Sequence, residues 1–140
     1  MEFEIHPYQS VDNFVFGASE SEVAAKNGPP LERVDDPIMG EVQETRPGLL
    51  LIYVDDTLVE VTIDKDQKAL LDGIDIFGDT GAAETLKAKS KFTEGDNGVL
   101  VLDDLGLCLR GFGKKKVPEG RTVTAFARDR LEFYGFMTQV

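Results

Sequence analysis

Apolar and polar positions alternate along the middle of the chain and predict short β-strands joined by tight turns. Residues 57–63, TLVEVTI, follow the period of two that is typical of a strand with one buried face. Residues 49–54, LLLIYV, are apolar on both sides, which predicts a strand in the interior of a sheet. Asp55 and Asp56 separate these runs, so we expect a β-hairpin with the acidic pair at its tip.

A second acidic pair lies between two apolar runs further along the chain. Asp103 and Asp104 separate VLVL from LCLRGF and predict another hairpin, with Gly106 in a left-handed conformation. Asn97-Gly98 follows the short run KFTE and predicts a tight turn, because both residues tolerate positive φ. In both acidic pairs the aspartates are expected to serve the turn first, since Asp tolerates left-handed geometry.

The remaining segments have weaker patterns. Residues 31–46 are polar and irregular, and predict one strand near Glu41–Thr45. Residues 64–73 predict a connection or a short turn of helix, and residues 113–120 a charged loop. TVTAFAR and RLEFYGF predict two final strands with a turn at Arg128–Arg130.

Two short helices are predicted. Ser19 and Glu22 form the S-x-x-E capping box, and Gly28 with the two prolines after it ends the first helix. The second helix is expected over Ala82–Ala88, capped by Asp79 or Thr80.

The two halves of the chain resemble each other and suggest an internal repeat. Each half has an aromatic residue and a glycine, then a short helix, then a hairpin. The candidate units are 11–63 and 72–111, followed by strands in 121–137, all in a single domain 1–140. Coincidence is the alternative, because helix–hairpin units are common.

These elements predict an α+β fold of two layers. The strands of both units would form one antiparallel sheet with the two short helices on one face. The opposite face of the sheet would be free to meet a partner.

The stretch FGASESEV and the closing GPP resemble the β-lactamase-inhibitor-protein-like fold and the related lipoprotein modules of outer-membrane assembly. The resemblance covers residues 16–30 and, loosely, 77–111. It implies a protein-binding module without enzymatic activity. Inhibitors of this fold present a concave sheet and a hairpin tip with an aspartate, and the matching positions here are Asp55 and Asp56. The chain lacks the leader, the lipid-attachment cysteine and the disulfide cysteines of such proteins, so the resemblance implies binding more than β-lactamase inhibition.

The charge of the chain narrows the class of partner. The net charge is -11, and residues 1–106 hold 23 acidic and 8 basic residues. Such a surface repels nucleic acid and attracts a basic protein. The alternative is that the acidity only keeps the protein soluble.

No apolar run approaches the roughly 18 residues of a membrane span, and the start MEFEIHPY is not a signal peptide. We therefore expect a cytoplasmic protein, unless a leader has been removed.

Candidate catalytic residues are few. His6 is the only histidine, and Cys108 lies in the apolar run LGLCL, where burial is expected. With 26 acidic residues, the several acidic pairs are expected by chance. The chain has neither a phosphate-binding loop nor an EF-hand pattern. We expect no enzyme, cofactor or metal, and a hydrolase that uses acidic pairs is a minor alternative.

These observations favour a non-catalytic, acidic protein-binding module of the inhibitor or immunity type that neutralises a partner protein, such as a basic toxin or enzyme. The expected contacts are Tyr53, Asp55 and Asp56, followed by Asp103 and Asp104. The alternative is a homodimeric structural or housekeeping module, joined through edge strands or through the apolar last segment.

Overall fold

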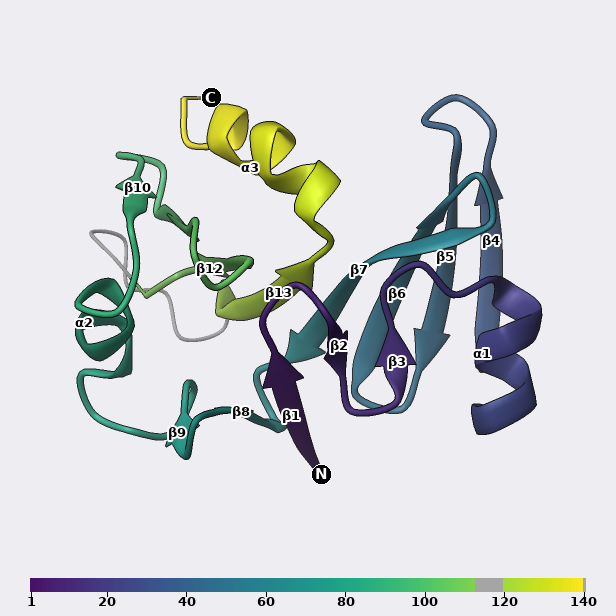
Figure 1. The fold of residues 1–140 in the computed structure, drawn as a ribbon, viewed down its shortest axis with the longest axis horizontal. Coiled ribbons are helices and arrows are strands. Elements are labelled where there is room, and N and C mark those ends of the chain that lie inside the picture. The colour runs from purple at the N-terminus through teal and green to yellow at the C-terminus, as the bar shows by residue number, and fades with distance from the viewer. Residues whose placement is uncertain (113–119, 140) are drawn as a thin grey trace.

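The computed structural model describes residues 1–112 and 120–139, which fold into two β-sheets and three short helices (Figure 1). The strands are β1 (Glu2–His6), β2 (Ser10–Val11), β3 (Phe14–Val15), β4 (Glu32–Asp36), β5 (Glu41–Arg46), β6 (Leu49–Val54), β7 (Thr57–Asp64), β8 (Lys68–Leu71), β9 (Ile74–Asp75), β10 (Phe92–Glu94), β11 (Val99–Leu102), β12 (Leu107–Arg110) and β13 (Thr122–Phe126). The helices are α1 (Glu20–Asn27), α2 (Ala82–Lys87) and α3 (Leu131–Met137), the last preceded by the 3₁₀ turn η2 (Arg128–Arg130). The predicted α+β class is confirmed, whereas the two-layer arrangement of tandem units stays a prediction.

The larger sheet has the strand order β10-β11-β12-β13-β7-β6-β5-β4, and its neighbouring strands are antiparallel. Strand β6 lies between β5 and β7, which confirms its predicted interior place. Strand β13 joins the two halves of the sheet, where the hydroxyls of Thr62 and Thr124 are 2.8 Å apart. The two Asp-Asp turns therefore belong to hairpins on opposite sides of β13.

The smaller sheet corrects the prediction for residues 64–73. Its order is β3-β2-β1-β8-β9, and β8 pairs in parallel with β1. The expected connection or helical turn is therefore wrong. Ala69 and Leu71 are fully buried while Lys68 is exposed, so this short segment has the period of a strand.

The C-terminal segment forms a helix instead of the last strand that was expected. Leu131 and Tyr134, three residues apart, both pack on the sheet, as the period of a helix requires. The Tyr134 ring stacks on Phe126 with centroids 4.5 Å apart. The alternation of apolar residues in RLEFYGF is also compatible with a strand, and tertiary packing selects the helix.

The first helix confirms its predicted capping box, because Ser19 Oγ accepts from the Glu22 N–H and Glu22 accepts from the Ser19 N–H. The predicted cap of the second helix is wrong. Gly81, with φ of 73°, precedes α2 without a side-chain cap, and Asp79 instead accepts the Asp75 N–H. Glycine allows this left-handed turn without strain.

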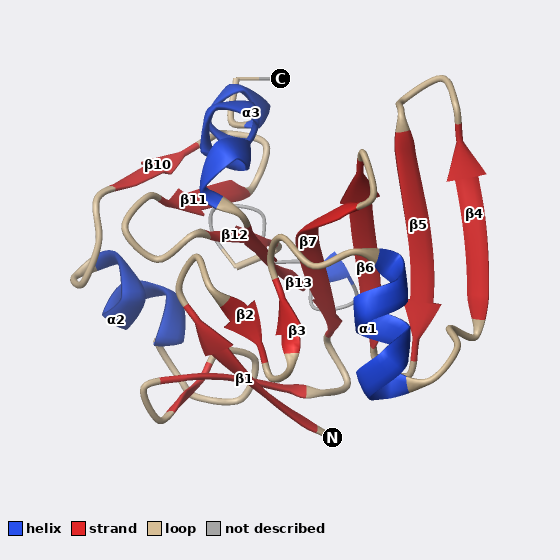
Figure 2. Ribbon diagram, turned by 45° about the vertical axis from the view of Figure 1, so that its right-hand side comes forward, coloured by secondary structure: helices blue, strands red, loops and turns tan. Residues whose placement is uncertain are grey.

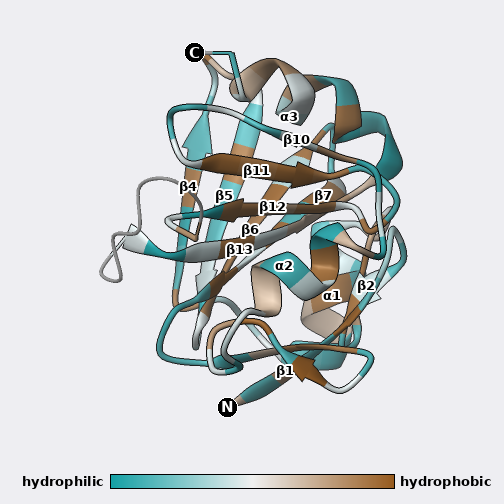
Figure 3. Ribbon diagram, turned by 90° about the vertical axis from the view of Figure 1, so that its left-hand side faces the viewer, coloured by the Kyte–Doolittle hydropathy of each residue, from teal (hydrophilic) through white to brown (hydrophobic). Residues whose placement is uncertain are grey.

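The main core lies between one face of the larger sheet and a layer formed by α1, α2 and the smaller sheet. In Figure 3, α2, α1 and β1 lie below strands β11–β13 of this sheet. Val23 of α1, Leu86 of α2 and Ile5 of β1 are buried there against sheet residues such as Leu51 and Leu109. Helix α3 covers part of the opposite face, near β11–β13. No helix of the described residues is long and apolar enough to cross a membrane.

Candidate partner-binding surface

The β6–β7 turn confirms the prediction that Asp55 and Asp56 serve a tight turn. Both residues adopt left-handed conformations, with φ of 52° and 56°, as a two-residue hairpin turn requires. Both side chains are exposed. The expected role of this acidic tip as a partner contact stays a prediction.

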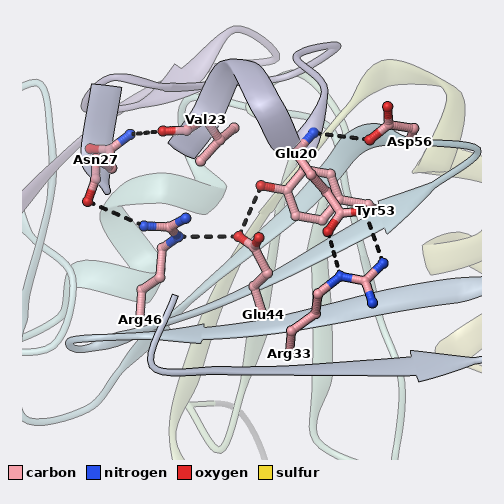
Figure 4. Close-up of polar contacts among 8 residues, drawn as sticks. All are labelled: Glu20, Val23, Asn27, Arg33, Glu44, Arg46, Tyr53 and Asp56. Atoms are coloured by element: carbon pink, nitrogen blue, oxygen red, sulfur yellow. Dashed lines mark hydrogen bonds and ion pairs between the residues drawn. The ribbon is translucent and has the colours of Figure 1, made fainter. Parts of the chain in front are cut away.

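Asp56 also has a structural contact that Asp55 does not share. Its carboxylate accepts the N–H of Glu20 at 3.0 Å, at the start of α1 (Figure 4). A carboxylate here satisfies a free helix N–H and interacts favourably with the positive end of the helix dipole. Asp56 therefore ties the hairpin tip to α1.

Tyr53 cannot be a surface contact, which corrects the expectation. Its side chain is fully buried, and its hydroxyl donates to the Glu44 carboxylate at 3.0 Å. Burial, together with the charge of Glu44, raises the pKa of Tyr53 well above its ordinary value. The alternation of β6 places Tyr53 on the core face.

Asp103 and Asp104 are tied to another part of the molecule. Asp104 accepts the Lys91 N–H at 2.9 Å, and its own N–H donates to Ser90 Oγ. The Asp103 carbonyl accepts from the Tyr8 hydroxyl. Gly106 follows with φ of 63°, as predicted. This pair fixes the β11–β12 turn to its neighbours, and its role as a partner contact stays a prediction.

A buried polar network supports the other end of the larger sheet. Arg46 donates to Glu44 at 3.1 Å, and both side chains are less than 5% exposed. Arg46 also donates to the Asn27 carbonyl at 3.5 Å, at the end of α1 (Figure 4). Since Glu44 also accepts from Tyr53, the network links β5, β6 and α1.

The β4–β5 hairpin is the most exposed apolar feature in this region, and the sequence pattern did not predict it. Four large apolar side chains of this segment are exposed: Leu31 (70%), Val34 (46%), Ile38 (92%) and Met39 (62%). The hairpin extends beyond the β6–β7 turn in both views (Figures 1 and 2). The apolar pair in the turn PIMG, between two polar runs, could have drawn attention to it.

The hairpin tip is well formed despite its exposure. Asp36 Oδ1 accepts the N–H groups of Ile38 and Met39, each at 3.2 Å, and Gly40 takes the left-handed conformation with φ of 68°. Arg33 is bound to Glu20 of α1 at 2.7 Å and holds β4 against the helix. The apolar tip is therefore presented by a defined turn.

Acidic side chains flank the exposed apolar residues. Glu32 and Asp35 of β4 are exposed, and Asp36 is half-buried. We call residues 31–41 the acidic hairpin. Arg33 is its only basic residue, and Glu20 already binds it. A basic partner would therefore meet carboxylates around an apolar centre.

The two residues singled out in the sequence for catalytic potential, His6 and Cys108, differ in their surroundings. His6 is exposed on β1, and Cys108 is buried, as expected. Burial raises the pKa of the Cys108 thiol to about 11, which disfavours the reactive thiolate. Among residues 1–112 and 120–139, no cluster of three His, Cys, Asp or Glu side chains could hold a metal ion.

Hollows of about 330, 350 and 470 Å³ on the described surface reach the volume of a ligand pocket, but they are open to solvent and do not enclose a ligand. One of about 330 Å³ lies along residues 76–84 beside Phe112 and Arg121, and is open to solvent. Another, of about 210 Å³, lies beside Phe14 and Arg46, below the roughly 300–1,000 Å³ of typical ligand pockets. The acidic hairpin is therefore the better candidate for recognition.

Comparisons of the chain with protein-family models, with characterised proteins and with solved structures give no match.

Proposed function

We propose that the protein is a non-catalytic, acidic protein-binding module of the inhibitor or immunity type, which acts in the cytoplasm by neutralising a basic partner protein. The observation that carries the proposal is the acidic hairpin. It combines exposed apolar side chains with carboxylates on a projecting, well-formed turn. Exposed apolar groups rimmed by polar residues mark protein interaction sites.

Charge supports a basic partner. The chain carries a net charge of -11, so its field attracts a positively charged protein and raises the association rate. The apolar residues of the acidic hairpin would then provide the contact that holds the complex together. The resemblance to the β-lactamase-inhibitor-protein-like fold and its tandem units adds to this proposal, and Asp55, on the neighbouring tip, would extend the contact.

The proposal is tested by affinity capture with the wild-type chain and with the Ile38→Ser/Met39→Ser variant. Both substituted side chains are exposed, so the fold is expected to persist. We expect one basic protein to bind the wild type at low salt, to elute at high salt and to be absent from the variant. The recovered protein, once purified, should form a stoichiometric complex with the wild type by calorimetry. Recovery of the same proteins by both chains, or of none, would contradict the proposal.

A second candidate function, a homodimeric module, is favoured by the surface of α3. Phe133 and Phe136 are 41% and 64% exposed, and Phe136 lines an open hollow of about 470 Å³ with Thr93 of β10. A dimer through this helix would cover them. Sedimentation of the wild type and of Phe136→Ser tests it: a dimer that dissociates in the variant supports the module, and a wild-type monomer at all concentrations rejects it.

A further inference from the structure

We propose that strand β4 binds its partner by strand addition, and that the partner supplies an extended segment of the pattern basic-basic-apolar-polar-basic, running antiparallel to β4. This inference rests on the proposed function and specifies how the acidic hairpin recognises its partner.

The position of β4 in the sheet makes strand addition possible. Strand β4 is the last strand of the larger sheet, and among the described residues β5 is its one strand neighbour. Alternate backbone N–H and C=O groups of an edge strand point away from the neighbour and can pair with another chain. Figure 2 shows α1 in front of β5 and β6, and β4 at the open side of the sheet.

The exposure of β4 is unusual for a strand. Residues 32–35 are all exposed, so their side chains remain accessible even though Arg33 is bound to Glu20 of α1. Val34 at the centre is 46% exposed and has a β-branched side chain suited to a cross-strand apolar pair. An added strand would cover Val34 and extend the sheet.

The side chains of β4 specify those of the added strand. In an antiparallel pair, a basic residue is favoured opposite each of Asp36, Asp35 and Glu32, because opposite charges across strands attract. A β-branched apolar residue fits opposite Val34. Arg33 is already bound by Glu20, so a neutral polar residue suffices opposite it. The complementary segment, read from its amino end, is Lys-Lys-Val-Thr-Lys.

A second copy of this chain is a poorer occupant. Antiparallel pairing of two β4 strands about Val34 would place Glu32 of each chain opposite Asp36 of the other, and Asp35 opposite an Arg33 that Glu20 already binds. Like charges directly opposite across strands are destabilising. The acidic residues therefore protect this edge against self-association while leaving it open to a basic strand.

The direct probe is a synthetic peptide with Lys-Lys-Val-Thr-Lys between flanking threonines, titrated into the full chain by calorimetry. A matched peptide has Pro in place of the central Val, with the same charge. Proline removes a backbone donor and disfavours a strand. We expect the proline peptide to bind at least about tenfold more weakly. Equal binding of the two peptides, or no binding of the first, would overturn strand addition.

Charge reversal on the protein tests the register. The variant Glu32→Lys/Asp35→Lys changes two exposed side chains of β4, and Asp64→Lys/Asp66→Lys changes the net charge equally at exposed positions away from this edge. The first variant should lower the affinity for the lysine peptide about tenfold and the second far less. The first should in turn prefer the peptide Lys-Glu-Val-Thr-Glu, which keeps a lysine opposite Asp36 and places glutamates opposite the two new lysines. An equal loss in both variants would show attraction by net charge alone and would overturn the inference.

The proposed function and this inference can fail separately. If a basic protein binds the wild type but not Ile38→Ser/Met39→Ser, and the two peptides bind with equal affinity, strand addition is rejected. The proposed binding module is then still supported. If neither protein nor peptide binds the acidic hairpin, both are rejected.

Discussion

Two adjacent residues with the same backbone conformation have different roles in the β6–β7 turn. Asp55 and Asp56 are both left-handed, but only the carboxylate of Asp56 accepts the first N–H of α1. The turn itself thus accounts for both aspartates, and helix capping adds a contribution from one of them. Turn formation is therefore enough to explain why two aspartates occur here, and no catalytic role is needed to explain them.

Replacing each aspartate by alanine separates these contributions. Both substitutions introduce the strain of a left-handed alanine, but Asp56→Ala also removes the hydrogen bond to the Glu20 N–H. We expect Asp56→Ala to lower the free energy of unfolding by about 1 kcal/mol more than Asp55→Ala. Urea denaturation measures the difference. Equal losses would show that the contact with α1 contributes nothing.

The burial of a single residue, Tyr53, could not be predicted from the sequence. Tyr53 lies next to the turn in the sequence, and its apolar neighbours on both sides gave no indication of which face it occupies. The register of β6 with β5 places it opposite Val42, beside Glu44 on the core face. Only this tertiary pairing shows that its hydroxyl is unavailable to a partner.

At the scale of elements, the Glu44–Arg46–Tyr53 network holds β5, β6 and α1 together behind the acidic hairpin. Its two charged side chains are nearly fully buried. A buried charge without its partner is strongly destabilising, whereas a pair of hydrogen-bonded opposite charges is tolerated. The stability of this end of the sheet therefore depends on the pair more than on either member.

Arg46→Met should lower the free energy of unfolding by about 3–5 kcal/mol, because it leaves the Glu44 carboxylate buried and unpaired. In the double variant Glu44→Gln/Arg46→Met the charge is gone and the amide oxygen can still accept from Tyr53. We expect the double variant to be more stable than the single one in urea denaturation. If it is less stable, the account of the network is wrong.

Helix α3 is attached to the larger sheet through a group of charges. Arg130 contacts Glu60 at 2.7 Å and Glu41 at 3.7 Å. Burial raises the pKa of Glu41, and the charges of Glu60 and Asp36 raise it further, against the opposing effect of Arg130. The carboxylate form of Glu41 is therefore disfavoured by folding.

This shift predicts a pH-dependent effect of Glu41→Gln. A raised pKa in the folded state contributes stability at pH below the ordinary value of the group, and this contribution is lost as the pH rises through the folded-state pKa. Glutamine does not titrate, so the variant should gain stability relative to the wild type between about pH 4 and pH 7. Thermal unfolding at the two pH values measures the gain. A stability difference between the variant and the wild type that is the same at both pH values, or that changes in the opposite direction, would contradict this prediction.

The β6–β7 and β11–β12 hairpins of the larger sheet were predictable from the sequence because apolar runs flank turn residues in both. The capping box of α1 was predictable from its S-x-x-E spacing. Elements without such signals were not predictable. Strand β8 follows the polar residues 64–67, and β4 has an exposed, charged sequence that only pairing with β5 makes a strand. The candidate surface was missed for the same reason.

In the whole molecule, the net negative charge and the open edge of the larger sheet would act together in binding a basic partner. Most acidic residues lie before residue 107, and the acidic hairpin stands at the end of the sheet away from α2 and β10 (Figure 1). A basic partner would be attracted by the overall field and then bound at the acidic hairpin. This order of events predicts an affinity that falls as ionic strength rises, since salt screens exposed charges.

The most direct test of the acidic hairpin is photo-crosslinking in living cells, with a photoreactive amino acid at Ile38 and, as a matched control, at the exposed Thr85 of α2. If the acidic hairpin binds the partner, position 38 should give a discrete adduct with one basic protein and position 85 should give none. The Glu32→Lys/Asp35→Lys substitution should abolish the adduct. An adduct formed equally at both positions, or formed at position 85 alone, would contradict the assignment of the acidic hairpin as the partner-binding surface.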